Sequence, residues 1–499
     1  SDVYKRQDFI IKSDCFVYRE QNTSDLVRYQ PAFRLKSYIC VCNQIGSMNE
    51  NVLTKLKILA ESAKYDVSCA SSGTVRSNKP GMLGNTVGGW GICHSFAEDG
   101  RCISLLKVML TNYCIYDCAY CINRRSNDLP RATFSVSELV ELTMEFYRRN
   151  YIEGLFLSSG VVRNPDYTME RLVRVAKDLR QVYRFNGYIH LKSIPGASRE
   201  LVNEAGLYAD RLSVNVEIPK EENLKLLAPE KDHKSVFAPM KYIQQGVLES
   251  KEERQKFRHA PRFAPAGQST QVIVGATSES DKDILFLSSA LYGRPTMKRV
   301  YYSGYVSVNT YDKRLPALKQ PPLVRENRLY QADWLLRFYQ FKVDEIVDDS
   351  YPDLDLEIDP KLSWALRHPE QFPVDINKAD YEMLLRVPGV GVKSAKLIVA
   401  SRRFSRLGFY ELKKIGVVMK KAQYFITCKE LPLQMQTVNE LSPQRVRSLL
   451  LPKPKKKVDE RQLLLDFGYD PDEIEELLMD TAAMEEAIAE AKTLLQCEE

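Results

Sequence analysis

The stretch CISLLKVMLTNYCIYDCAYC, residues 102–121, joins a run of β-branched and apolar residues to three closely spaced cysteines. The apolar run is typical of a buried strand. Cys114, Cys118 and Cys121 follow it with the spacing C-x3-C-x2-C, and the next cysteine is Cys428. Three sulfur ligands are therefore expected at the exit of one strand, without a fourth nearby.

Further apolar runs follow this strand and alternate with amphipathic helical patterns of roughly ten to fifteen residues. Ser135 and Glu138 form the capping-box pattern that marks the start of the first such helix. Alternating strands and helices predict a parallel sheet. We therefore expect an α/β fold, a partial (β/α)6 barrel of the TIM type. Its six strands are expected at 102–110, 153–159, 187–193, 211–218, 270–277 and 299–308.

Three kinds of site are compatible with three cysteines on one loop. A structural zinc site is tetrahedral and closed, so it normally needs a fourth ligand. A ferredoxin-type cluster takes four thiolates at other spacings. A cubane held by three cysteines leaves one iron without a protein ligand, and this open position is available for chemistry.

The motif resembles that of the radical S-adenosylmethionine (radical SAM) superfamily, with the aromatic Tyr120 before Cys121 at the exit of the first barrel strand. The resemblance implies a [4Fe-4S] cluster on Cys114, Cys118 and Cys121. It also implies S-adenosylmethionine bound at the open iron and cleaved reductively to a 5′-deoxyadenosyl radical that abstracts hydrogen from a substrate. Barrel enzymes place their active sites at this end of the strands.

The same resemblance implies further cofactor contacts, although the family's acidic residue after the second strand is absent from "SSG", 158–160. On the fourth strand, polar residues alternate onto one face, where they bind a ligand or are satisfied by neighbouring groups. On the fifth strand the match is to an adenine-binding motif whose glutamate stands one residue late here. The cofactor-binding candidates are Tyr120, Ser159, Gly160, Asn215, Glu217, Gly275 and Glu279.

Three other cysteines, Cys69, Cys93 and Cys102, precede the motif. They are candidates for an auxiliary metal or a second cluster, or are buried thiols that pack as small apolar groups. Crowded cysteines favour metal binding in a reducing compartment over a disulfide framework. With no visible signal peptide, this predicts a cytoplasmic protein.

Composition changes divide the chain. We expect an upstream segment at 1–47, a Cys- and Gly-containing extension at 48–100, the barrel at 101–345 with an insertion at 229–267, and a linker at 346–372. A helical domain is expected at 373–430, followed at 431–499 by a linker and an acidic helix. Net charge is +6, but residues 376–429 contain 12 basic and 3 acidic residues, whereas residues 470–499 contain 11 acidic residues and one lysine.

The stretch INKADYEMLLRVPGVGVKSAKLIVASRR, 376–403, resembles the helix-hairpin-helix module of DNA repair and replication proteins. Gly389 and Gly391 would let the hairpin present backbone N–H groups to a phosphate, with Lys393 and Ser394 beside them. Residues 407–426 resemble a degenerate second copy. The alternative is a hairpin used for protein contact, but the positive charge favours DNA.

Other segments suggest partners. "QLLLDF", Gln462 to Phe467, resembles peptides that dock on the bacterial replication sliding clamp, or simply begins the terminal helix. Residues 48–430 resemble a bacterial family of radical SAM proteins assigned to DNA modification or repair, which implies a DNA-glycosylase-like partner and an external electron donor.

The leading hypothesis is a radical SAM enzyme that acts on a base or sugar of DNA. A duplex target would have to be extruded from the stack. One alternative is a radical SAM enzyme that modifies transfer RNA. The other is a DNA-binding iron-sulfur protein whose cluster is structural or senses redox state. Tyr301, Tyr302 and Tyr305 are candidates for stacking on substrate.

Overall fold

The computed structural model describes residues 50–64, 92–96, 102–429 and 442–451. The chain divides into two compact units, residues 1–54 and 55–499. The described part of the first unit is the start of helix α2 (Glu50–Ala63). The predicted upstream segment and the predicted acidic helix lie outside the described residues, as do Cys69 and the peptide from Gln462 to Phe467.

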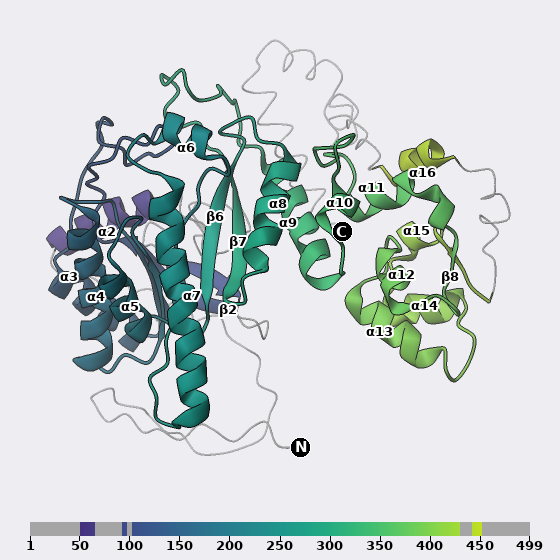
Figure 1. The fold of residues 1–499 in the computed structure, drawn as a ribbon, viewed down its shortest axis with the longest axis horizontal. Helices are drawn as coiled ribbons and strands as arrows, with labels where there is room; N and C mark the ends of the chain where they lie inside the picture. The colour runs from purple at the N-terminus through teal and green to yellow at the C-terminus, as the bar shows by residue number, and fades with distance from the viewer. Residues whose placement is uncertain (1–49, 65–91, 97–101, 430–441, 452–499) are drawn as a thin grey trace, which may run out of the picture. The chain divides into compact units, whose positions relative to one another are not determined.

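A curled seven-stranded sheet in the order β1 to β7 forms the centre of the barrel (Figure 1). Strands β2 to β7 run parallel, and β1 pairs antiparallel with β2 at the edge. The predicted α/β partial barrel is confirmed, and all six expected strands are present. The strands are β1 (Ile92–Phe96), β2 (Cys102–Met109), β3 (Gly154–Ser158), β4 (Tyr188–Lys192), β5 (Arg211–Ser213), β6 (Gln268–Val274) and β7 (Met297–Gly304).

Helices between the strands cover the outer face of the sheet, as the alternating pattern predicted. Ser135 and Glu138 form the expected capping box at the start of α3. Leu155 and Leu157 of β3 are fully buried, which explains why that strand reads as one continuous apolar run. The helices are α3 (Val136–Arg148), α4 (Pro165–Gln181), α5 (Arg199–Tyr208), α6 (Glu221–Leu227), α7 (His233–Lys256) and α8 (Asp281–Tyr292).

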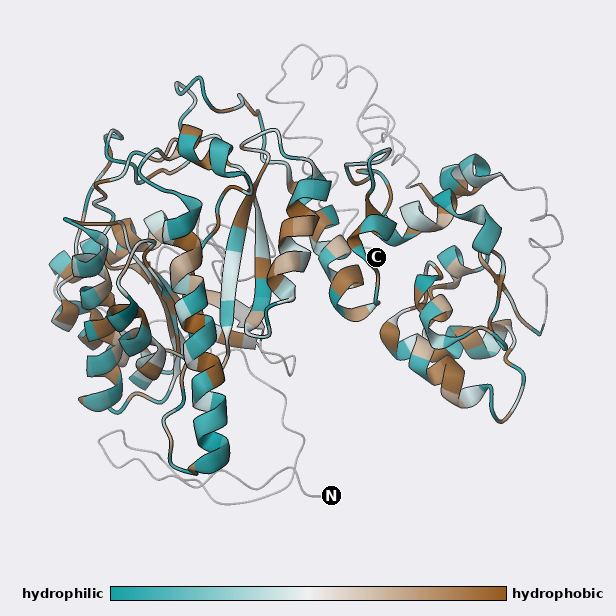
Figure 2. Ribbon diagram, viewed as in Figure 1, coloured by the Kyte–Doolittle hydropathy of each residue, from teal (hydrophilic) through white to brown (hydrophobic). Residues whose placement is uncertain are grey.

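The segment expected as an insertion, 229–267, contains α7, which packs against α5 and β6. Its apolar residues, such as Met240 and Ile243, are buried, whereas its C-terminal end is hydrophilic (Figure 2). This helix therefore belongs to the layer around the sheet. Strand β5 is shorter than expected, because it ends at Ser213 and resumes only as a single bridge between Glu217 and Val272.

The remaining elements of the described residues are helices, apart from a small parallel pair of strands. They comprise α9 (Leu323–Phe338), α10 (Val343–Ile346), α11 (Pro360–Arg367), a 3-10 turn (Pro369–Gln371), β8 (Val374–Asp375), α12 (Tyr381–Arg386), α13 (Val392–Ser401), α14 (Phe409–Ile415), α15 (Met419–Ala422), β9 (Ile426–Thr427) and α16 (Pro443–Leu450). Among the described residues, no helix is both long and apolar enough to cross a membrane.

Candidate functional site

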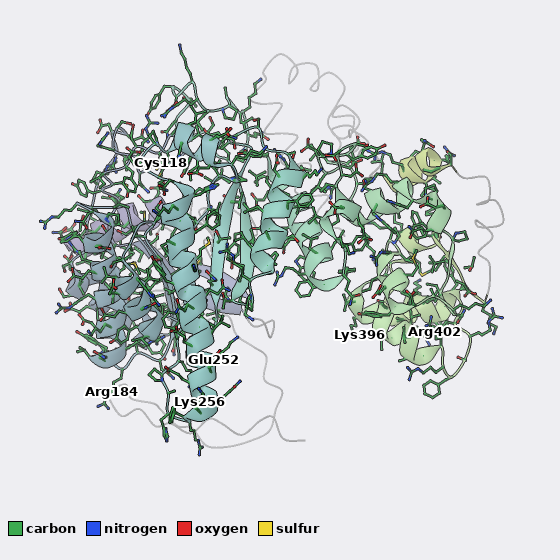
Figure 3. All side chains as sticks on the ribbon, viewed as in Figure 1. Cys118, Arg184, Glu252, Lys256, Lys396 and Arg402 are labelled. Atoms are coloured by element: carbon green, nitrogen blue, oxygen red, sulfur yellow. The ribbon has the colours of Figure 1, made fainter. Side chains whose placement is uncertain are left out.

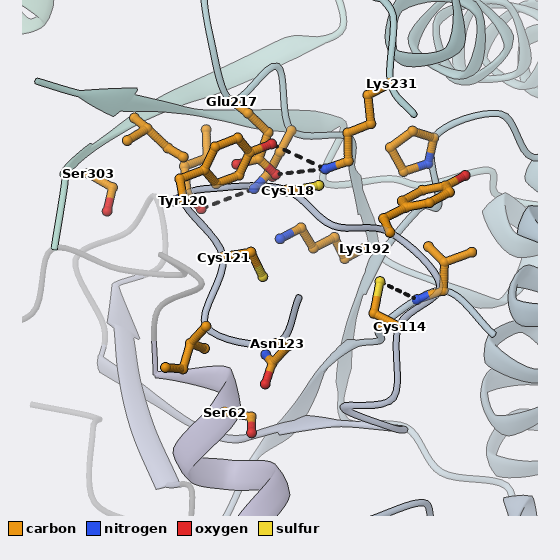
Figure 4. Close-up of a pocket in the computed structure, with 18 of the residues that line it drawn as sticks. Ser62, Cys114, Cys118, Tyr120, Cys121, Asn123, Lys192, Glu217, Lys231 and Ser303 are labelled. Atoms are coloured by element: carbon orange, nitrogen blue, oxygen red, sulfur yellow. Dashed lines mark hydrogen bonds and ion pairs between the residues drawn. The ribbon is translucent and has the colours of Figure 1, made fainter. Parts of the chain in front are cut away.

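The three motif cysteines lie on the loop that leaves β2 and line one cavity (Figure 4). The loop is held by its backbone: Ile115 N–H donates to the Val161 carbonyl (2.8 Å) and Ala119 N–H donates to the Leu227 carbonyl (2.7 Å). The Val161 N–H in turn donates to the Cys114 sulfur at 3.4 Å. Cys118 lies at the end of the barrel where the parallel strands finish, and Arg184 and Lys256 lie at the other end (Figure 3).

The cavity has a volume of about 180 Å³, far above the ~10–15 Å³ that one water needs. It is lined by the ends of several strands, so groups distant in sequence face one space. Of the predicted cofactor contacts, Tyr120, Ser159, Gly160, Asn215 and Glu217 line it. The structure brings these five together, and their cofactor roles remain predictions.

Gly160 is required by packing as well as by any ligand. A Cβ atom at this position would lie 2.2 Å from the Tyr113 carbonyl oxygen. The Gly160 N–H also donates to the Thr111 carbonyl at 2.8 Å. A side chain here would therefore push the cysteine loop away from the end of β3.

Gly275 and Glu279 do not line the cavity. Gly275 adopts a positive φ of 84° beside Pro322, in the turn that leaves β6. The Glu279 carboxylate is buried and accepts a hydrogen bond from Asn223 at 2.7 Å. Both residues lie outside the cavity lining, and their contact with a cofactor stays a prediction.

Two cavity residues were missed by the sequence reasoning, Lys231 and Asn123. The Lys231 ammonium lies 3.4 Å from the Tyr120 hydroxyl and 3.9 Å from a Glu217 carboxylate oxygen. The Asn123 carbonyl oxygen Oδ1 is buried with no hydrogen-bond partner among the described residues. A ligand donor would satisfy this atom, since buried polar groups are rarely left unpaired. No local pattern distinguishes either residue from other lysines or asparagines.

Burial and mutual repulsion act together on the thiols. Burial raises the pKa of the Cys118 thiol and, with the neighbouring Cys118 and Cys114 sulfurs, raises the pKa of Cys121 to about 12. Burial alone lowers the pKa of Lys231, but the surrounding Cys118, Tyr120 and Glu217 raise it overall. A bound metal would favour the thiolates strongly, and Lys231 supplies a compensating positive charge.

These features fit a cluster held by three cysteines. The thiols line a cavity with room beyond them, and Cys114 already accepts a backbone N–H. Among the described residues, no three His, Cys, Asp or Glu side chains converge as a single metal ion requires.

The auxiliary-metal prediction for Cys69, Cys93 and Cys102 is not tested. Cys69 and the side chain of Cys102 lie outside the described residues. The Cys93 thiol is half-buried on β1, whose residue Phe96 pairs with Cys102 in β2. Of the three tyrosine candidates, Tyr305 directly follows β7 and lines the cavity, whereas the fully buried Tyr302 on β7 donates to Ser288 at 3.0 Å.

The basic segment forms two helix-turn-helix pairs, α12 with α13 and α14 with α15. Gly389 adopts a positive φ of 88°, and a Cβ atom there would lie 2.5 Å from the Val418 carbonyl oxygen. The Gly389 carbonyl accepts the Val418 N–H at 2.9 Å, so the two turns pack directly on one another. Leu412 and Ala422 are fully buried, and the resemblance of this pair to a second copy stays a prediction.

The four predicted DNA contacts differ in their surroundings. Lys393 is exposed near the start of α13, and Gly391 is the N-cap of this helix. The Ser394 side chain is buried and donates to the Gly416 carbonyl at 3.2 Å, so its hydroxyl is used inside the module. Gly389 is committed to the packing between the turns.

Residues 108–247 match the family model of the radical SAM superfamily. No curated protein matches the chain. Among solved structures, the chain resembles the FeFe-hydrogenase maturase HydG from Carboxydothermus hydrogenoformans (13% identity, 46% of this chain and 49% of that one, TM-score 0.34). It also resembles the coproporphyrinogen III oxidase HemN from Escherichia coli, a radical SAM enzyme (14% identity, 51% of this chain and 56% of that one, TM-score 0.29).

A third similar structure is the cobalamin-dependent S-adenosylmethionine radical enzyme OxsB (10% identity, 80% of this chain and 64% of that one, TM-score 0.27). The chain spans about half the length of the HydG and HemN structures. These values are too low to transfer a reaction. The family match over β2 to α7, with its three cysteines at one cavity, identifies a radical SAM superfamily domain in this chain, an enzyme domain whose cofactors are a [4Fe-4S] cluster and S-adenosylmethionine.

Proposed function

We propose that this protein is a radical SAM enzyme that modifies or repairs DNA. The observation that carries the proposal is the cavity in which Cys114, Cys118 and Cys121 face the polar ends of β3 and β5. Bound there, the cluster and S-adenosylmethionine supply a 5′-deoxyadenosyl radical that abstracts hydrogen.

The chain's own residues have three roles in this proposal. Cys114, Cys118 and Cys121 hold the cluster, while Lys231 and Glu217 offer a cation and an anion to the amino acid part of the cofactor. Apolar side chains complete the lining and exclude water, which protects a reactive intermediate. These are Met109, Ile194, Ile273, Val306 and Val308.

The proposed substrate class rests on the module at 373–429. Between residues 391 and 429 the chain contains ten basic residues and one acid, Glu411. Such charge neutralises phosphates without reading sequence. Because the cavity lies inside the barrel, a duplex substrate would have to present an extruded or damaged base.

The test uses the full chain, reconstituted anaerobically with iron and sulfide. It is incubated with S-adenosylmethionine, a reductant, and either duplex DNA, single-stranded DNA or transfer RNA. We expect 5′-deoxyadenosine in every reaction, with a mass change only in DNA. A mass change in transfer RNA alone would replace DNA by RNA as substrate. Absence of 5′-deoxyadenosine under every condition would leave a non-catalytic cluster.

A further inference from the structure

The turn of the first hairpin, which the sequence predicts as the phosphate site, is largely engaged by protein groups. The Lys361 ammonium donates to the Val390 carbonyl at 2.5 Å. The Tyr339 hydroxyl lies 3.7 Å from where a Cβ of Gly391 would stand. A phosphate bound at this helix end would therefore lie beside Tyr339.

A different part of the module projects freely. Residues 403–406, Arg-Phe-Ser-Arg, are all exposed between α13 and α14. Phe404 is 90% exposed, the highest value among the exposed large hydrophobic residues of the described chain. Single exposed apolar residues are common, so exposure alone would mean little, but this one stands between Arg403 and Arg406.

Both ends of this loop are anchored to the body of the module. On one side, the Arg402 guanidinium donates to the carbonyls of Ile376 (3.0 Å) and Ala379 (2.6 Å). On the other side, Asn377 and Leu407 exchange two hydrogen bonds of 3.1 and 2.8 Å. Arg402 lies at the lower edge of the module in Figure 3. Anchoring presents the loop in one position, so little ordering entropy remains to oppose binding.

The adjoining helix continues the same chemistry. Tyr410 at the start of α14 is 63% exposed, and the Lys414 ammonium lies 4.4 Å from the centre of its ring. Lys413 is exposed beside it. Aromatic rings among exposed cations are the signature of surfaces that stack on bases while cations neutralise the backbone.

We propose that the loop 403–406 is the module's contact with nucleic acid, with Phe404 stacked on an unpaired base and Arg403 and Arg406 on the flanking phosphates. This rests on the proposed function and specifies how the substrate is held. An aromatic side chain that engages an unpaired base suits an enzyme whose target must leave the stack.

The test measures binding of labelled oligonucleotides to the full chain by fluorescence anisotropy, using a single strand, its duplex, the duplex with one mismatch, and the RNA strand of the same sequence. Phe404→Ala is expected to weaken single-strand binding roughly 5- to 150-fold, the range of one stacked base. The slope of affinity against salt should not change, because no charge is removed. Phe404→Tyr should restore affinity.

Phe257→Ala is the matched control, since Phe257 is 67% exposed between Lys256 and Arg258 at the end of α7. It should bind like the wild type. Arg403→Ala should lower the salt slope by about 1. Circular dichroism would check that each variant is folded, and Phe404 contributes little packing to lose.

The outcomes separate the two proposals. If the wild type binds no nucleic acid, the proposed function fails. If it binds and Phe404→Ala binds equally well, this inference alone is overturned. Equal weakening on duplex and single strand would also overturn stacking on an unpaired base. Tighter binding to RNA with the same Phe404 effect would retain the stacking loop and reject DNA as the substrate.

Discussion

The barrel cavity and the module at 373–429 use charged residues in opposite ways. In the cavity, Lys231 is largely enclosed and lies among Glu217, Tyr120 and the thiols. In the module, lysines and arginines such as Lys393 and Arg403 are exposed with almost no acids nearby. Enclosure strengthens each interaction and suits chemistry that must exclude water. Exposure suits a polyanion, whose binding depends on the release of counterions.

The largest effect is expected in the cavity, from loss of one cysteine ligand of the cluster. Cys118→Ala should reduce bound iron after reconstitution to background and abolish 5′-deoxyadenosine, because two thiols and one solvent ligand hold a cubane poorly. Iron and sulfide analysis with visible absorbance would measure it. Cys428→Ala, a half-buried thiol of the module, should load iron normally. Full loading of the Cys118 variant would contradict the cluster assignment.

Lys231→Met tests whether the enclosed positive charge of Lys231 contributes to S-adenosylmethionine binding. Removal of a buried charged partner costs about 1.5–3 kcal/mol, or roughly 10- to 150-fold in affinity. We expect that loss in S-adenosylmethionine binding by the reconstituted protein, measured by equilibrium dialysis. Lys225→Met removes half of an exposed ion pair with Glu221 and should change affinity little. An unchanged affinity for Lys231→Met would show that this lysine has no role in the cofactor site.

Lys361 lies on α11, just outside the module, and its side chain is buried against the module's first turn. Burial lowers its pKa from 10.5 to about 7, with Lys421 opposing and Asp359 favouring the charge. Between these values the unfolded chain binds the extra proton, so stability should rise with pH from about 7 towards 10 and become independent of this group below 7.

Between pH 7 and 10 the free energy of unfolding is expected to rise by on the order of 1 kcal/mol per pH unit. Urea unfolding monitored by tryptophan fluorescence at several pH values would measure it. Lys361→Met should flatten the profile, whereas Lys396→Met, on the exposed face of α13, should not. A Lys361→Met profile that keeps the wild-type slope would assign the pH dependence to other groups.

The smallest expected effect concerns the exposed charge of the module. Lys393→Glu should weaken DNA binding a few-fold and lower its salt dependence by about 1 or more, since one phosphate contact is lost. Cleavage of S-adenosylmethionine without DNA should be unaffected. Lys241→Glu on α7, also exposed, is the control. Unchanged binding by Lys393→Glu would exclude the N-terminus of α13 from the DNA contact.

Most of the fold was predictable because it depends on short-range pattern. Apolar runs separated by amphipathic helices specify parallel strands, and all six were found within a few residues of their expected limits. Strand β1 was missed because ICHSF, 92–96, has no apolar alternation of its own and pairs only as an antiparallel edge. Strand β5 was overestimated because its pairing stops at Ser213 and returns only as a single bridge between Glu217 and Val272.

The candidate site was predictable only in part. The cysteine spacing and the strand ends identified Cys114, Ser159 and Asn215 as residues that could share a space, and they line one cavity. Gly275 and Glu279 also follow a strand end, yet neither residue lines the cavity. Ser394 looked like a phosphate ligand, but its hydroxyl faces the Gly416 carbonyl.

The barrel, the cluster motif and the basic character of the module could be predicted from the residues alone, because periodicity, ligand spacing and charge are local properties of a chain. Which distant groups meet became known from the folded structure. It brought Lys231 to Tyr120 across 111 residues of sequence and Tyr339 to the first hairpin turn, and it left Phe404 exposed. Such contacts depend on how whole elements pack, which no single stretch of residues specifies.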